Sequence, residues 1–305
     1  MTTRERVPLR FRSGSDDCQG WHYPGSNGAC VVMAGGFAVT KEPGTDLFAS
    51  RFHAAGFSVL AFDYRHLGGS GGTPRQVAPV RRQLADWGAA LRCAGTLPEV
   101  DPARVAIWGF SVSAGHVVRV AAAHPGVAAA VAQTPSVDGP AAARNAAGHT
   151  TAAAVGRLTA VGVADTIRGL VGAAPLLVPL VGPPGTLAVL STPDALAAGD
   201  TALNPQNRYP DWQQAVAARS ALAMAGYRPG RRAGRVRCPL LVVVAEHDQS
   251  APPGPAVRVA AAAPYGELVT VAGGHYAPFL SGHEQAVQAE LTFLRRTLLA
   301  AECAS

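Results

Sequence analysis

Apolar runs of strand length recur along the chain and set its framework. The runs are rich in Val, Ile, Leu and Ala and mostly apolar, without the alternation of a strand that has one face in water. Strands buried on both faces of a parallel sheet have this pattern. The runs occupy residues 30–34, 58–63, 105–108, 127–133, 240–245 and 268–271. Two further segments, 7–12 and 19–23, predict an antiparallel pair that opens the chain.

Stretches with helical spacing of apolar residues lie between these runs. They occupy residues 45–55, 77–94, 114–124 and 255–263, and a final one spans residues 284–299. A chain that alternates strands with helices builds parallel units whose helices cover both faces of one sheet. The pattern therefore predicts an α/β fold with a doubly wound, mostly parallel sheet.

Residues 139–235 interrupt this alternation just before the strand at 240–245. Residues 145–163 are Ala-rich and predict a helix, and residues 211–224 predict a second one. We interpret residues 139–235 as a helical lid (cap) inserted into an α/β core made of residues 1–138 and 236–305. Tyr209 and Trp212 are candidate walls of an apolar pocket under this lid.

Residues 169–193 form the most apolar part of the proposed lid, because they carry no charged side chain. Their length reaches that of a membrane span. The prolines within the segment would leave backbone groups unpaired in lipid, so we expect no stable membrane insertion and favour a lid that roofs an apolar pocket.

A serine lies at the bend where the run 105–108 gives way to a helical pattern. The sequence there is Gly109-Phe110-Ser111-Val112-Ser113, and small residues flank the bend. A strand, a sharp turn and a helix are typical of a nucleophile elbow, which lifts the serine Oγ above the edge of the sheet. Ser113 is the alternative nucleophile, but it would already lie in the first helical turn. Ser111 is therefore the favoured nucleophile.

An acid and a histidine follow in the order that this kind of site requires. Asp248 comes just after the strand 240–245, and His275 follows the strand 268–271 and a glycine-rich turn. The competing residues are Glu246, which we expect to point away, and His283, which lies in a helical pattern. Tyr276, next to His275, is a further candidate pocket residue.

These three residue types are needed together for nucleophilic catalysis. A serine hydroxyl is a weak nucleophile until a neutral imidazole takes its proton, and a carboxylate holds that imidazole in the correct tautomer. A glycine turn after the strand 30–34 predicts the fourth element, an oxyanion hole. We expect its backbone N–H donors to be Phe37 and Val112.

With these elements, the chain resembles the α/β-hydrolase superfamily, and most of all bacterial serine hydrolases of the dienelactone-hydrolase, thioesterase and X-prolyl-peptidase-like branch. The turn Asp63-Tyr-Arg65-His-Leu-Gly68-Gly-Ser70 is similar to one found in that family. The resemblance covers residues 1–138 and 236–305. The chain departs from the family pattern at Gly35-Gly36, where many relatives have His-Gly, and at Ser113, which stands in place of the second glycine of the elbow.

Composition and charge narrow the classes of partner. The chain has 305 residues, 48% of them hydrophobic, and a formal net charge of +6 that is carried almost entirely by dispersed arginines. Nucleic-acid binders concentrate charge on one face, so we expect no nucleic-acid partner. The densest arginine cluster lies within residues 231–237 and would suit an acidic or acyl-carrier partner. The amino terminus lacks the apolar core of a signal peptide, and the five cysteines are scattered, which favours the cytoplasm.

We therefore expect a serine hydrolase that cleaves an ester or thioester with a hydrophobic acyl or alcohol part. No metal or organic cofactor is implied, and the partner is a small-molecule substrate. The same triad can also run acyl transfer, elimination or perhydrolysis, because a fold does not fix a reaction. A non-catalytic binding module is a second alternative. An epoxide hydrolase or dehalogenase would have aspartate in place of Ser111.

Overall fold

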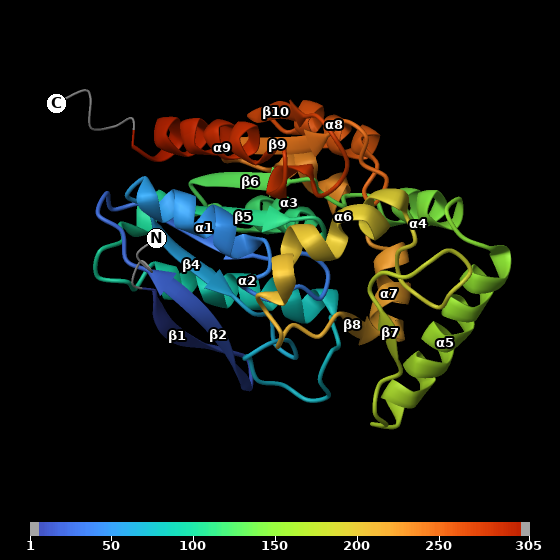
Figure 1. Cartoon of the computed structure of the whole chain (residues 1–305). Helices are drawn as coiled ribbons and strands as arrows, with labels where there is room; N and C mark the ends of the chain where they lie inside the picture. Colours follow the sequence, from blue (N-terminus) through green and yellow to red (C-terminus); the bar gives the residue numbers. More distant parts are fainter. Residues whose placement is uncertain (1–5, 300–305) are drawn as a thin grey trace.

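An eight-stranded sheet forms the centre of the protein, whose structure is a computed structural model that describes residues 6–299 (Figure 1). The ends of the predicted core, residues 1–5 and 300–305, lie outside the described part, and Cys303 with them. The strand order is β1-β2-β4-β3-β5-β6-β9-β10. β1, β2 and β4 are joined antiparallel and all other neighbours are parallel, which confirms the predicted fold class. The strands are β1 (Val7–Ser13), β2 (Asp16–Tyr23), β3 (Cys30–Ala34), β4 (Ser58–Phe62), β5 (Val105–Phe110), β6 (Ala129–Gln133), β9 (Leu240–Ala245) and β10 (Gly266–Val271).

Helices cover both faces of this sheet. α1 (Thr45–Ala54) and α9 (His283–Leu298) pack on one face. α2 (Val80–Ala94), α3 (Val112–Ala123) and α8 (Pro253–Ala262) pack on the other. Every residue of β3, β4, β5, β6 and β9 is buried, as their unbroken apolar runs predict. Short 3₁₀ helices lie at Pro102–Arg104, Pro205–Asn207, Pro229–Arg235 and Ala277–Phe279.

The segment between β6 and β9 builds a separate group of elements at one end of the sheet, drawn in green to orange in Figure 1. It contains α4 (Gly139–Ala147), α5 (Ala152–Leu170), β7 (Leu177–Pro179), α6 (Pro193–Leu203), β8 (Ala215–Ala217) and α7 (Ala218–Ala225). We call residues 139–235 the insertion. None of the helices described in residues 6–299 is long and apolar enough to cross a membrane.

Two helices predicted in the insertion differ from those observed. The predicted helix 145–163 is divided between α4 and α5, because α4 ends at the cap Gly148 and Thr151 caps the start of α5 by accepting a hydrogen bond from the Ala154 N–H. The predicted helix 211–224 begins only at Ala218. Residues 215–217 form β8 instead, since their backbone pairs with the distant β7.

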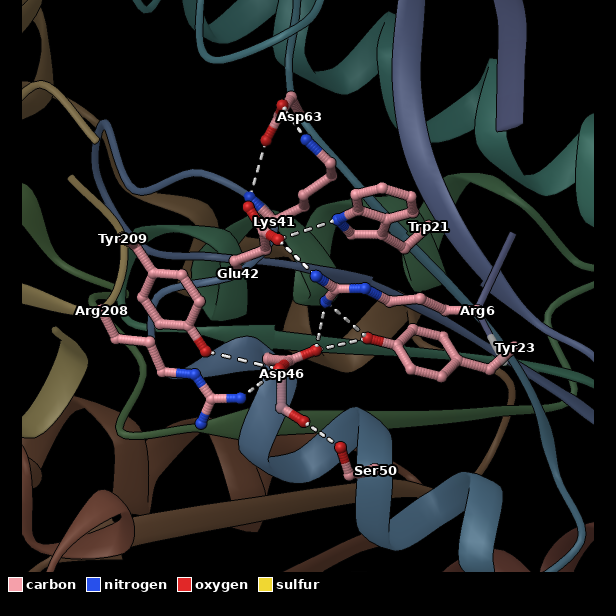
Figure 2. A network of polar contacts seen from close by, with 10 residues as sticks. All are labelled: Arg6, Trp21, Tyr23, Lys41, Glu42, Asp46, Ser50, Asp63, Arg208 and Tyr209. Carbon is pink, nitrogen blue, oxygen red and sulfur yellow. Dashed lines mark hydrogen bonds and ion pairs between the residues drawn. The ribbon is translucent and has the colours of Figure 1, made fainter. Parts of the chain in front are cut away.

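A polar network fastens the insertion to the amino-terminal part of the sheet (Figure 2). The carboxylate of Asp46 on α1 accepts hydrogen bonds from Arg6 at 2.7 Å and from the hydroxyl of Tyr23. The hydroxyl of Tyr209, from the insertion, lies 3.3 Å from the other oxygen of Asp46. Asp46 therefore joins the β1–β2 hairpin, α1 and the insertion.

Candidate active site

Ser111 lies at the tight turn between β5 and α3. Its φ of 56° and ψ of −114° are costly for a residue with a side chain, and the turn leaves the serine half-buried. A Cβ at Gly109 would lie 2.6 Å from the backbone of Ser113, so the residue two positions before the serine must be glycine. Ser113 is fully buried in the first turn of α3, 2.6 Å from the hydroxyl of Tyr64. Of the two serines, only Ser111 therefore lines a cavity.

Three residues predicted for the site form one chain of hydrogen bonds. His275 Nε2 is 3.0 Å from Ser111 Oγ, and His275 Nδ1 is 2.7 Å from Asp248 Oδ2. The second oxygen of Asp248 accepts the Ala251 N–H at 2.6 Å, which orients the carboxylate. His275 is 2% exposed and Asp248 is 6% exposed.

The competing residues lie elsewhere. Glu246 is exposed at the end of β9. His283 stands at the start of α9, where its Nδ1 lies 3.1 Å from the carbonyl oxygen of Pro278. The structure therefore brings the favoured serine, histidine and aspartate together and leaves the alternatives apart.

The surroundings of His275 suit a base. Burial acts to lower the pKa of its imidazole, but the carboxylate of Asp248, and that of Asp194 further away, attract a proton and hold this pKa above its ordinary value. With the Nδ1–H donated to Asp248, Nε2 is left to accept the proton of the Ser111 hydroxyl. This arrangement can activate the serine as a nucleophile.

The glycine turn after β3 comes close to Ser111. A Cβ at Gly36 would lie 3.5 Å from Ser111 Cβ and 3.1 Å from the ring of Phe110, so this backbone lies close to the serine and a side chain here would crowd Phe110. The next residue, Phe37, lines the same cavity as Ser111 and Val112. The two expected N–H donors therefore come from segments that flank the serine.

Sequence reasoning missed Asp194, at the start of α6 in the insertion. Its Oδ2 accepts hydrogen bonds from the backbone N–H groups of Gln249 at 2.8 Å, Ser250 at 3.1 Å and His275 at 3.2 Å. Its Oδ1 accepts the Ser250 hydroxyl at 2.9 Å. One carboxylate thus holds the loop that carries Asp248 and the loop that carries His275. The sequence shows only an acidic residue in a first helical turn, which is a common place for one.

Two cavities meet at Ser111. The larger, of about 240 Å³, is lined mainly by α4, α5 and α7. The smaller, of about 60 Å³, is lined by Trp212 and Tyr276, which are two of the three predicted pocket residues. Tyr209 lines neither cavity, because its hydroxyl is turned to Asp46. The indole N–H of Trp212 donates to the Ala38 carbonyl at 2.9 Å, which ties the insertion to the glycine turn.

No group of three or more His, Cys, Asp or Glu side chains within residues 6–299 is placed to hold a metal ion. The cysteines in that part, Cys18, Cys30, Cys93 and Cys238, are free thiols.

Comparison with known proteins identifies one matching family and several similar proteins. The model of the family described as serine aminopeptidase, S33, matches residues 25–275. The quorum-quenching protein AidA of Acinetobacter baumannii is 36% identical over 295 residues, which cover 95% of this chain and 94% of AidA. A thiohydrolase of Eupenicillium brefeldianum is 34% identical over 115 residues, 37% of each chain. The crystal structure of the α/β hydrolase GrgF from Penicillium sp. sh18 superposes with a TM-score of 0.81 at 21% identity, over 96% of this chain and 99% of GrgF.

Proposed function

Because the chain belongs to the serine aminopeptidase family of α/β hydrolases, we propose that it is a serine hydrolase that cleaves an ester or thioester with a hydrophobic acyl part. The hydrogen-bonded chain from Ser111 through His275 to Asp248 carries this proposal. The apolar cavities beside Ser111 support the hydrophobic substrate. The thiohydrolase of E. brefeldianum, by its name, supports a thioester as one substrate class.

In the first step, Ser111 Oγ attacks the carbonyl carbon while His275 Nε2 takes the hydroxyl proton. Asp248 stabilises the imidazolium that forms. The negative charge that develops on the carbonyl oxygen is held by the N–H groups of Phe37 and Val112, and losing one such donor typically costs about 3 kcal/mol of transition-state stabilisation.

Collapse of this intermediate breaks the bond to the leaving group, which takes the proton from His275 Nε2. The acyl group then remains on Ser111. In the second step His275 takes a proton from water, and the resulting hydroxide-like oxygen attacks the acyl carbon. The carboxylic acid product leaves and Ser111 regains its proton.

The insertion serves as the lid of this site in our proposal. Its helices supply most of the wall of the larger cavity, and Trp212 and Asp194 attach it to the loops that carry the reacting groups. Removal of a quorum signal is a second candidate role, because the similarity to AidA extends over 95% of this chain.

The nucleophile is tested by Ser111→Ala. We expect turnover of p-nitrophenyl esters and of quorum signals to fall by several orders of magnitude with folding intact, because no other group can form the acyl-enzyme. Labelling with a fluorophosphonate, followed by mass spectrometry of the modified peptide, should find a single adduct on Ser111.

Ser113→Ala is the matched control. It removes a hydroxyl that is bonded to the Gly35 carbonyl and to Tyr64 but does not line a cavity, so labelling at position 111 should persist. An adduct on Ser113, or a Ser111→Ala variant as active as the wild type, would contradict the proposal.

A further inference from the structure

The two cavities lie on chemically different sides of Ser111. Both are lined by Ser111 and Phe37. Val112 lines the larger cavity alone, whereas His275 and Tyr276 line the smaller one alone. The general base is therefore in the wall of the smaller cavity only.

This asymmetry assigns the two halves of a substrate. The leaving group must receive its proton from His275 Nε2, and the attacking water must give a proton to the same atom. Both therefore enter from the side of the smaller cavity. The acyl group occupies the opposite side of the carbonyl carbon, which is the side of the larger cavity.

The larger cavity is suited to an uncharged chain. Its wall contains seven alanines from α4, α5 and α7, with Leu158, Leu222 and Met224, and seven serine and threonine residues also line it. Among the described residues that line it, none carries a charge. A dry cavity of about 150 Å³ binds benzene, so a cavity of about 240 Å³ has room for roughly ten carbon atoms.

The smaller cavity limits what can stand beside His275. Its volume is about 60 Å³. A water molecule needs about 10–15 Å³ of such a cavity, so this space holds a few waters or the narrow end of an alcohol or thiol. Water is thus a better acceptor here than a branched alcohol.

We propose that the α4–α5–α7 cavity is the acyl site of this enzyme and selects medium-length, uncharged acyl groups of roughly ten carbons, while the His275 side admits water or a narrow leaving group. This inference rests on the proposed hydrolase function. Ala221 on α7 lines this cavity. In our proposal its small side chain sets the width that is available to the acyl chain.

The test is a series of methyl esters of straight-chain acids from acetate to palmitate, followed by release of the acid. With the wild type, kcat/KM should rise by up to about fourfold for each methylene buried until the chain fills the cavity near decanoate, and then stop rising. Ala221→Leu should lower the decanoate-to-butyrate ratio of kcat/KM by at least about tenfold, because three added carbon atoms would occupy the chain's path.

Ala223→Leu is the matched control, since Ala223 is exposed on the same helix and does not line the cavity. It should leave the ratio unchanged. Ala146→Leu makes the same test from α4 should Ala221→Leu not fold. A ratio that stays the same in both cavity variants overturns the assignment, as does a change confined to esters that differ in their alcohol part.

Fluorophosphonate labelling separates this inference from the proposed function. Variants that are labelled on Ser111 and hydrolyse esters, but keep the wild-type chain-length preference, overturn the acyl site alone. A folded wild type that neither labels nor cleaves any ester overturns both.

Discussion

At the scale of single residues, Asp194 is the least expected contributor to the site. It belongs to the insertion, yet it accepts hydrogen bonds from the backbone of His275 and from the loop of Asp248. Burial acts to raise the pKa of Asp194, but hydrogen bonds such as that from the Gln249 N–H hold this pKa below its ordinary value. Asp194 is therefore a positioning residue that stays ionised at neutral pH.

The charge of Asp194 should appear in the pH profile. His275 must be neutral to act as a base, and its pKa is raised, so the acidic limb of kcat/KM should have its midpoint above about 6.5. The charged or titratable groups that face the imidazole are Asp248, Asp194 and the hydroxyls of Ser111 and Tyr276. Asp194→Asn removes an anion that favours the imidazolium, so the midpoint should move to lower pH.

Asp211→Asn is the control for this shift. Asp211 is an exposed carboxylate of the same insertion, and its removal changes the net charge by the same amount. Equal midpoints for Asp194→Asn, Asp211→Asn and the wild type would show that Asp194 does not act electrostatically on His275.

Glu290 on α9 is a second residue in an unusual environment. Its side chain is fully buried, with Oε2 accepting the Trp108 indole N–H at 3.0 Å and Oε1 without a hydrogen-bond partner among residues 6–299. Burial raises the pKa of this carboxyl well above 4.5. The folded protein therefore keeps Glu290 protonated at pH values where the unfolded chain ionises it.

The sign of the resulting pH dependence follows from linkage. A carboxyl whose pKa is raised by folding contributes its full stability below about 4.5 and loses it progressively as pH rises towards the folded-state pKa. Glu290→Gln cannot ionise and keeps an acceptor for Trp108. Its free energy of unfolding relative to the wild type should increase between pH 4 and pH 8, because over this range the unfolded wild type ionises its carboxyl while burial opposes ionisation in the folded state. Denaturant unfolding at both pH values measures this, and a difference independent of pH would contradict it.

At the scale of elements, the insertion is held together by a buried carboxylate on α5. Asp165 is fully buried, and its two oxygens accept the backbone N–H groups of Leu176 at 2.8 Å and of Arg219 at 2.9 Å. These contacts fix the start of β7 and the first turn of α7 against α5. The fold of the insertion thus depends on polar contacts that no hydrophobic pattern reveals.

Asp165→Ala should loosen this part of the molecule. Two buried backbone donors and Arg219 would lose their acceptor, at a cost of about 1–3 kcal/mol for each unsatisfied group. Limited proteolysis should then cut faster between residues 170 and 176, and the proposed acyl site should bind its substrate more weakly. Asp211→Ala, at an exposed position, should leave the cutting rate unchanged. Equal rates for both variants would show that Asp165 does not hold these elements.

At the scale of the whole molecule, the centre of the sheet could be predicted because β3, β4, β5, β6 and β9 are apolar over nearly their whole length. β10 is an edge strand and is mostly not buried, so the expectation that its run lies buried on both faces was wrong. Ser111, Asp248 and His275 each follow a predicted strand, so their meeting at one edge was also predictable. The insertion could be predicted only as an interruption in the alternation of strands and helices, and not by the elements that it contains. Residues 215–217 took the form of a strand because of a partner nearly forty positions away, and that pairing leaves no local signal.

The positions of Tyr209 and Asp194 were beyond sequence reasoning for the same cause. Tyr209 is the kind of aromatic residue that often lines a pocket, but its hydroxyl lies next to Asp46 (Figure 2). Its side chain lines neither of the two cavities. An acidic residue such as Asp194 is common at the start of a helix, but the fold brings this one against loops more than fifty positions later in the chain. Long-range polar contacts determine where both side chains lie.

The alanine wall of the larger cavity has a consequence for how this protein recognises a ligand. Alanine has no side-chain rotamers to lose, so the alanine part of the wall contributes almost no conformational entropy cost when a ligand is bound. That part of the wall cannot reshape itself by changing rotamers, whereas Leu158, Leu222 and Met224 can. A ligand that presses on the alanine positions must displace the helices that carry them, so recognition is rigid along those helices and adaptable only at the longer side chains.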